Sequence, residues 1–164
     1  MAILKIENGK QYTGIGMINY IYDIEKHDNK VYGFGIGADL RNNIVDFMLT
    51  KCLCNKLDKN QYLQLVLSIT EMESRDLSYG RMKELISFFE EVGYFIAQKF
   101  CVQIMGAIHG NTDNLHAHYI LNTVCLNDGK MLNIKLKDLY DLKLDINNLL
   151  HRYDLNPIKV NHYD

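Results

Sequence analysis

The sequence predicts an α+β domain with a central, mainly antiparallel sheet and helices on its faces. Segments of strand length alternate with segments of helical spacing, and the last two strands are separated only by a short polar turn, as in a hairpin. With 164 residues, of which 48% are hydrophobic and 23% charged, the chain is typical of a globular protein with a substantial core. We therefore expect residues 1–164 to form a single domain in the order β-α-β-α-β-α-β-β-α.

Four elements are expected in the first part of the chain. Residues 3–6 are expected to form a short apolar strand. In residues 14–24, apolar side chains recur at nearly helical spacing, which predicts a helix. Residues 31–36 form a strand rich in glycine. A helix then begins at residue 42 or 43, where an asparagine can cap it, and continues to about residue 54. The side chains expected to face inward from this helix are Ile44, Phe47, Met48 and Leu53.

A central strand and a long helix are expected next. Residues 62–70 alternate weakly between polar and apolar side chains, which favours a strand. Ser78 can cap a helix that continues to about residue 99. An apolar stripe at helical spacing predicts which face of this helix is buried. The stripe consists of Met82, Leu85, Phe89, Val92 and Ile96.

A hairpin and a final helix are expected in the last third of the chain. Residues 102–109 and 117–124 are apolar, and residues 110–115 between them carry Gly, Asn, Thr and Asp, which favour turns. The final helix spans residues 136–153, and Pro157 prevents its continuation.

Three histidines in this hairpin predict a metal site. Closing the turn places His109 opposite His116, and the alternation of side chains along a strand places His118 on the same face, with Ile120 and Asn122. A His-x-His pair alone is common on protein surfaces, but a third histidine in register across the turn favours a shared ligand. Three imidazoles suit a divalent ion with open positions for water or substrate. No cysteine pair accompanies them, so a closed structural zinc site is not expected.

The stretch HGNTDNLHAHYILN, which begins at His109, also resembles the metal motif of mobilisation relaxases of the MobA/VirD2-like type. These relaxases belong to the HUH endonuclease superfamily, in which two histidines flank a hydrophobic residue. The resemblance covers most of the chain from about Tyr12 to Leu132. It extends, in the family's order, to GMINYIYDIEKHD, VYGFGIGADLRNNIVDFMLTK, YLQLVLSIT and VCLNDGKML.

The resemblance implies a metal-dependent enzyme that nicks one DNA strand at a specific site and transfers it through a phosphotyrosine intermediate. Such enzymes mobilise plasmids or conjugative elements. The metal would be a divalent ion, Mg²⁺ or Mn²⁺, bound by His109, His116 and His118. The substrate would be single-stranded DNA at an origin of transfer, and accessory mobilisation proteins are possible partners. A related HUH transposase or rolling-circle initiator is the alternative enzyme.

Tyr20 is the expected nucleophile, because it stands in the NYI segment that resembles the nucleophile segment of the relaxases. Tyr22 is the second candidate. Small HUH transposases instead carry the tyrosine on a helix after the metal motif, which would nominate Tyr140 or Tyr153. Core packing is the alternative role for each of these tyrosines.

Three polar residues near the motif are candidates for supporting roles. Asn111 stands where the relaxase pattern usually has Asp, and it can hold a histidine tautomer by a hydrogen bond but cannot act as a base. Asp113 matches a second acidic position of some members; it can orient a histidine, accept the tyrosine proton or simply form the turn. Asn122 either hydrogen-bonds a metal ligand or is an ordinary polar strand residue.

The charge balance sets an expectation about DNA binding. Eighteen basic and twenty acidic residues give a net charge of −2, whereas proteins that bind the DNA backbone usually have a basic surplus. Lys130, Lys135 and Lys137 predict a local basic patch beyond the second metal strand. We expect weak DNA binding by this domain alone, with a partner supplying affinity. A relaxase-derived protein that binds metal and DNA, or a partner relaxase, without nicking is a third interpretation.

The sequence also bears on location. No apolar run approaches the roughly 18 residues needed to span a bilayer, and the N-terminus lacks the pattern of a signal peptide. We therefore expect a cytoplasmic protein without a membrane partner.

Overall fold

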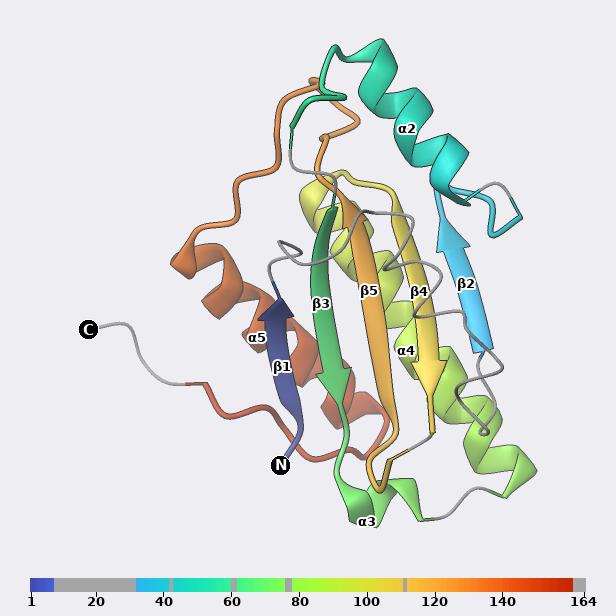
Figure 1. The fold of residues 1–164 in the computed structure, drawn as a ribbon. Coiled ribbons are helices and arrows are strands. Elements are labelled where there is room, and N and C mark those ends of the chain that lie inside the picture. Colours follow the sequence, from blue (N-terminus) through green and yellow to red (C-terminus); the bar gives the residue numbers. More distant parts are fainter. Residues whose placement is uncertain (8–31, 42, 60–61, 76–77, 111, 161–164) are drawn as a thin grey trace.

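The computed structural model describes residues 1–7, 32–41, 43–59, 62–75, 78–110 and 112–160. Within these ranges the chain forms strands and helices in a mixed order (Figure 1). The strands are β1 (Ile3–Glu7), β2 (Tyr32–Ile36), β3 (Tyr62–Ser68), β4 (Ile104–His109) and β5 (His116–Asn122). The helices are α2 (Asn43–Leu53), α3 (Glu71–Ser74), α4 (Tyr79–Phe100) and α5 (Leu136–Arg152).

Most of these elements match the prediction to within a few residues. The exception is α3, which was missed: strand β3 ends at Ser68, two residues before its expected end, and a short helix begins at Glu71, where no element was expected. A capping box at Thr70 and Glu73 begins this helix, since each side chain pairs with the backbone N–H of the other residue. The helix expected at residues 14–24 lies outside the described residues.

The five strands form one sheet in the order β1-β3-β5-β4-β2, and every pairing is antiparallel. The hairpin strands β4 and β5 therefore lie inside the sheet, with β1 and β2 at its edges (Figure 1). This arrangement confirms the predicted α+β class and its mainly antiparallel sheet.

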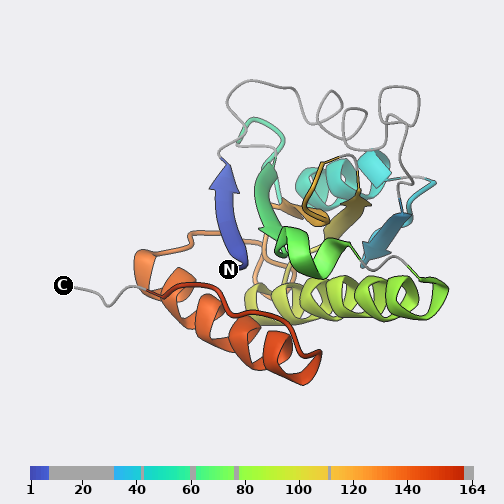
Figure 2. The ribbon, with the colours of Figure 1, turned by 90° about the horizontal axis from the view of Figure 1, so that it is seen from below.

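Helices α4 and α5 cover one face of the sheet, which we call the core face (Figure 2). Tyr119 of β5 points to this face, is fully buried and donates its hydroxyl to the carbonyl of Phe89 at 3.0 Å. The predicted stripe of α4 is confirmed, because four of its five residues are completely buried and Met82 packs against the same core. The four are Leu85, Phe89, Val92 and Ile96.

The opposite face carries the three histidines, and we call it the histidine face. At one end, α2 packs on it through Phe47 and Ile44, which join Tyr62, Met105 and Ile120 in a small apolar cluster. The helix contacts this face through one side only, and several apolar side chains on its other side are exposed. The prediction that Met48 and Leu53 face inward was therefore wrong: their side chains are 46% and 77% exposed. None of the described helices is long and apolar enough to cross a membrane.

Candidate metal centre

The β4–β5 hairpin brings His109, His116 and His118 together, as predicted. His109 pairs with His116 across the ladder, and His118 lies two residues further along β5, opposite Ala107. The ring centroids are 5.4 Å apart for His109 and His116, 4.8 Å for His109 and His118, and 5.1 Å for His116 and His118. One nitrogen from each ring lies within 4.8 Å of the other two. The three rings therefore surround a single point.

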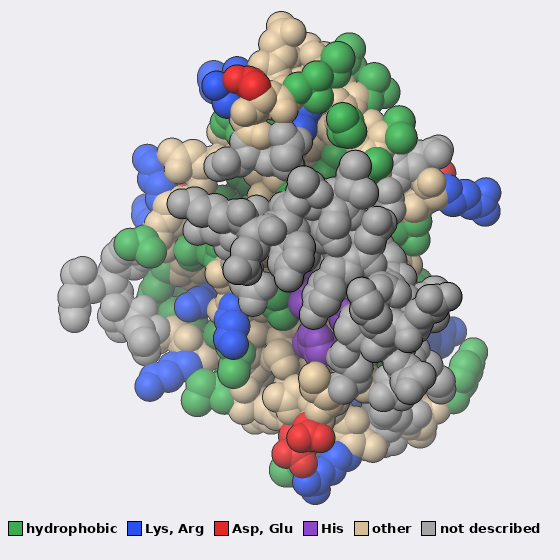
Figure 3. Space-filling model, in the orientation of Figure 1, with side chains coloured by type: hydrophobic (Ala, Val, Ile, Leu, Met, Phe, Trp, Pro, Cys, Tyr) green, Lys and Arg blue, Asp and Glu red, His purple; other side chains and the backbone are tan. Residues whose placement is uncertain are grey.

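The donor set and the burial of the rings fit a divalent metal ion. His109 is 2% exposed, whereas His116 and His118 are half-buried, so the cluster is closed on one side and open on the other. A buried imidazole without a ligand carries a desolvation cost that coordination removes. Three neutral nitrogen ligands leave positions open for water or a substrate oxygen. Figure 3 shows the histidines on the histidine face, with Lys and Arg side chains nearby.

A backbone carbonyl fixes the tautomer of His116. The Nδ1 atom of His116 lies 3.0 Å from the carbonyl oxygen of Asn114 and 3.5 Å from the hydroxyl of Thr112. A carbonyl can only accept a hydrogen bond, so the proton of the neutral ring is on Nδ1. The lone pair of Nε2 is then available to a metal, as is usual for metal-ligating histidines.

Gln64 supports His118 from the neighbouring strand. Its side chain is 1% exposed, and its Nε2 lies 2.6 Å from Nδ1 of His118. Sequence reasoning missed this residue. The available signal was a polar side chain inside the apolar strand YLQLVLS, but its relation to His118 depends on the pairing of β3 with β5, which are far apart in sequence.

The short helix α3 holds the turn of the hairpin in place. The N–H of Leu115 donates to Oγ of Ser74 at 2.8 Å, and the carbonyl of Leu115 accepts from the N–H of Ile69 at 3.1 Å. Both backbone groups of Leu115, one residue before His116, are thus fixed by the segment after β3. Sequence reasoning missed this support as well, although the pattern of Thr70 and Glu73 is a readable helix start.

The other predicted residues lie in different surroundings. Asn122 is buried, and its amide donates to Oε1 of Gln103 at 2.8 Å and to the carbonyl of Phe47 at 3.2 Å. These bonds tie β5 to α2 and not to a histidine. Asp113 is exposed in the turn, where it contributes to the raised pKa of Arg75, whose larger cause is a hydrogen bond to Glu71. Asn111, Tyr20 and Tyr22 lie outside the described residues.

Tyr140 lies on α5 and Tyr153 caps the C-terminal end of this helix, which covers the core face. The hydroxyl of Tyr153 donates to Oε2 of Glu91 at 2.9 Å, and its ring packs edge-on against Phe88. Burial raises its pKa, as does the carboxylate of Glu91. The sheet thus separates α5 from the histidine face, which disfavours Tyr140 and Tyr153 as nucleophiles at the cluster (Figure 2).

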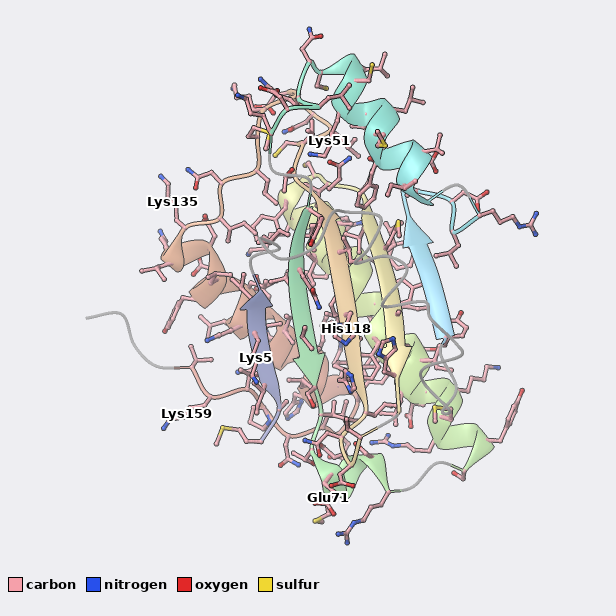
Figure 4. All side chains as sticks on the ribbon, viewed as in Figure 1. Lys5, Lys51, Glu71, His118, Lys135 and Lys159 are labelled. Atoms are coloured by element: carbon pink, nitrogen blue, oxygen red, sulfur yellow. The ribbon has the colours of Figure 1, made fainter. Side chains whose placement is uncertain are left out.

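The lysines predicted to bind DNA lie at some distance from the histidines. Lys130 forms an ion pair with Asp128 at 3.0 Å, and Lys137 is exposed in the first turn of α5. Lys135 precedes α5 at the end of the sheet remote from His118 (Figure 4).

Lys5, which sequence reasoning missed, is nearer to the cluster. It pairs with Val66, and Val66 pairs with His118, so the three residues form one row across β1, β3 and β5. Two strand spacings separate Lys5 from His118 along this row, or about 10 Å between backbones. Lys5 is exposed and lies on the same side of the sheet as His118 (Figure 4).

A hollow of about 520 Å³ adjoins the cluster on the histidine face. It lies between β1, β3, α3 and the turn of the hairpin, so its wall includes one of the three candidate ligands. Most of the residues that line it are polar or charged. The lining residues are Ile3, Lys5, Val66, Ser68, Glu71, Thr112, Asp113, Asn114 and His116.

Comparison with known proteins gives one family and several similar folds. Residues 20–155 match the sequence model of the family described as "Relaxase: MobA/VirD2-like, nuclease domain". No curated protein matches the chain by sequence.

Two solved relaxases illustrate the similarity of fold. The Mn-bound MobM relaxase domain (MOBV; Mob_Pre), in complex with plasmid pMV158 oriT DNA, is similar with a TM-score of 0.71 and 13% identity, over 99% of this chain and 92% of that one. The conjugative relaxase TrwC, in a copper-bound complex with oriT DNA, is similar with a TM-score of 0.58 and 13% identity, over 93% of this chain and 69% of that one.

Proposed function

The chain belongs to the MobA/VirD2-like nuclease-domain family of relaxases, and we propose that its histidine cluster and Tyr20 together cut and rejoin one strand of an origin-of-transfer DNA. The observation that carries the proposal is the convergence of His109, His116 and His118, with their ligand atoms within 4.8 Å of one another. A divalent ion bound there supplies Lewis-acid neutralisation of charge on the scissile phosphate and a fixed position for it. The uncharged ligands leave the full charge of the ion available for that purpose.

The all-nitrogen donor set bears on the choice of ion. Imidazole nitrogen is a better ligand for transition metals than for Mg²⁺, which prefers oxygen ligands. We therefore favour Mn²⁺ over Mg²⁺, although both were expected from the family resemblance. The similar MobM domain was crystallised with Mn.

Tyr20 is the proposed nucleophile. Its phenolic oxygen attacks the phosphorus of the scissile phosphodiester, and the bond from phosphorus to the 3′ oxygen breaks. The tyrosine proton passes to a base, and the departing 3′ oxygen takes up a proton. The products are a 5′-phosphotyrosyl DNA end and a free 3′-OH. Because the phosphodiester energy is retained in the new bond, the reverse attack by a 3′-OH reseals the strand.

Asp113 is the described carboxylate best placed to assist near the cluster. It lines the same hollow as His116 and is exposed in the turn between the two metal strands. We propose that it accepts the proton of the tyrosine or orients a histidine through the turn. Glu71 also lines the hollow but is paired with Arg75 at 2.5 Å.

We propose that the hollow beside His116 binds a nucleotide next to the nick. Its volume of about 520 Å³ lies within the range of small-ligand sites. Lys5 supplies a positive charge in its wall, and Ser68 and Thr112 line it with hydroxyl groups. Lys130, Lys135 and Lys137 are proposed to contact the strand further away. With a net charge of −2, the domain would need an accessory mobilisation protein for tight binding.

A covalent-adduct assay tests the proposal. The full chain is incubated with Mn²⁺ and a random-sequence pool of single-stranded oligonucleotides labelled at the 3′ end or at the 5′ end. We expect an adduct that resists SDS and carries only the 3′ label, because the protein remains on the 5′ end of the downstream fragment. Chelation by EDTA should abolish it. Sequencing the trapped downstream fragments and the released upstream fragments identifies the nick site.

Variants at single tyrosines identify the nucleophile. Tyr20→Phe should abolish the adduct, whereas Tyr22→Phe and Tyr140→Phe should retain it. Survival of the adduct in Tyr20→Phe would refute the assignment. A native protein that shifts DNA in a Mn²⁺-dependent manner but forms no adduct would establish the non-nicking interpretation, for which Asn111 and the net charge of −2 are the supporting observations.

A further inference from the structure

The two half-buried histidines of the cluster, His116 and His118, form different hydrogen bonds through Nδ1. Nδ1 of His116 faces the backbone carbonyl of Asn114, which can only accept a hydrogen bond. Nδ1 of His118 instead faces the side-chain amide of Gln64, 2.6 Å away. An amide carries a donor at one end and an acceptor at the other. The tautomer of His118 is therefore set by which end of Gln64 faces it.

The other end of this amide is unpaired. Oε1 of Gln64 is buried and has no hydrogen-bond partner among the described residues, although buried polar atoms are almost always satisfied. Rotating the amide by half a turn places Oε1 on Nδ1 of His118, where it accepts the N–H of the ring. The rotation exchanges one unpaired end for the other, so the two orientations are close in hydrogen-bond energy.

The two orientations differ in what His118 can do. With Nε2 of Gln64 donating to Nδ1, the proton of the neutral ring is on Nε2, and the nitrogen directed away from Gln64 cannot ligate. With Oε1 accepting from Nδ1, the proton is on Nδ1, and Nε2 carries the lone pair that can ligate a metal. Only the second orientation gives His118 the tautomer that the carbonyl of Asn114 imposes on His116.

We propose that Gln64 is a positioning residue of the metal site, whose amide oxygen holds the proton of His118 on Nδ1 and thereby makes Nε2 a metal ligand. This inference rests on the proposed metal-binding function of the cluster. Gln64 is suited to the role because it is almost completely buried and lies on β3 opposite Ile120, two residues from His118 on the adjacent strand. Being uncharged, it orients the ring without lowering the charge of the site.

Mn²⁺ binding to the full chain in the absence of DNA tests the proposal by calorimetry. Gln64→Leu removes both ends of the amide at similar volume, and we expect it to weaken Mn²⁺ binding by about 10- to 100-fold, as is usual for partners of ligating histidines. Gln64→Glu offers only acceptors, so it should bind Mn²⁺ at least as tightly as the native chain. Gln98→Leu, the same substitution at an exposed glutamine of α4, is the matched control and should bind like the native protein.

The tautomer of His118 can be read without metal from its ring ¹⁵N chemical shifts. Gln64→Glu should shift the ring toward the Nδ1–H form, and Gln64→Leu toward the Nε2–H form. Native-like Mn²⁺ affinity in folded Gln64→Leu would overturn the proposal, as would weaker binding by Gln64→Glu. A native chain that binds no Mn²⁺ would instead refute the metal site itself, so the two failures are distinguishable.

Discussion

Among the described strands, Lys5 is the one Lys or Arg residue, and it shares a cross-strand row with Val66 and His118. It also lines the hollow beside His116. Lys5 is an edge-strand residue, and lysines on exposed edge strands commonly serve to prevent pairing with other chains. Because it lies beside the proposed metal site, we expect Lys5 also to contact a DNA phosphate.

Lys5→Gln should reduce the salt dependence of single-stranded DNA binding. Removal of one phosphate contact lowers the slope of log K against log salt by about 0.7. The measurement is a fluorescence-anisotropy titration of a labelled oligonucleotide at several NaCl concentrations. Lys83→Gln, an exposed lysine on α4, is the control and should leave the slope unchanged. An equal slope for Lys5→Gln and the native chain would remove Lys5 from the interface.

At the scale of elements, the hairpin could be predicted from the sequence, but the contact of helix α3 with its turn could not. The register of His109 with His116 follows from a short turn and strict alternation, which are local properties of one stretch of sequence. Helix α3 has four residues, too few for a helical period to be visible, so the prediction extended β3 over the residues that precede it. Its contact with Leu115 joins segments 41 positions apart, and no local pattern indicates that contact.

Ser74→Ala should loosen the hairpin turn. It leaves the N–H of Leu115 without its partner at 2.8 Å, and an unsatisfied buried donor costs about 1–3 kcal/mol. We expect a lower free energy of unfolding in urea, faster amide exchange at Leu115 and weaker Mn²⁺ binding. Met72→Ala, on the same helix and 81% exposed, should change stability by no more than about 0.5 kcal/mol. Native exchange at Leu115 in Ser74→Ala would show that α3 does not hold the turn.

Helix α2 carries a buried lysine that makes stability depend on pH. Lys51 is 1% exposed and donates to Oγ1 of Thr123 at 2.8 Å. Burial lowers its pKa from 10.5 to about 8. Between these pH values the unfolded chain binds the proton and the folded chain does not, so stability increases with pH. The cost of burying the charge is fully present below pH 8 and is relieved above it.

Comparison with Lys51→Met isolates this effect. From pH 7 to about 10.5, the difference in unfolding free energy between the two proteins should change by about 2–3 kcal/mol in favour of the native chain. Urea unfolding across this pH range measures it. Lys59→Met, whose native side chain is 53% exposed, should show no such change. A difference for Lys51→Met that is constant with pH would contradict the shifted pKa.

At the scale of the whole molecule, the strand order decides which residues meet the cluster. The order β1-β3-β5-β4-β2 brings Gln64 and Lys5 to the histidines from strands that are distant in sequence. The fold class and the ligands could be predicted because they follow from periodicity and one hairpin. The roles of Gln64, Lys5 and Ser74 could not, because they depend on pairings between segments far apart along the chain. The misplaced Met48 and Leu53 have the same origin, since α2 contacts the histidine face through one side only.

The central claim is that the three histidines bind a metal ion that also contacts a DNA phosphate. Electron–nuclear double resonance on the Mn²⁺-loaded protein tests this claim most directly. The sample is Tyr20→Phe, which is expected not to cut, with an uncleaved oligonucleotide that contains the nick site identified in the adduct assay. We expect ¹⁴N couplings from three imidazoles and a ³¹P coupling from one phosphate, with one nitrogen lost in the additional variant His118→Ala. A spectrum of fully hydrated Mn²⁺, without nitrogen or phosphorus coupling, would contradict the assignment of the site.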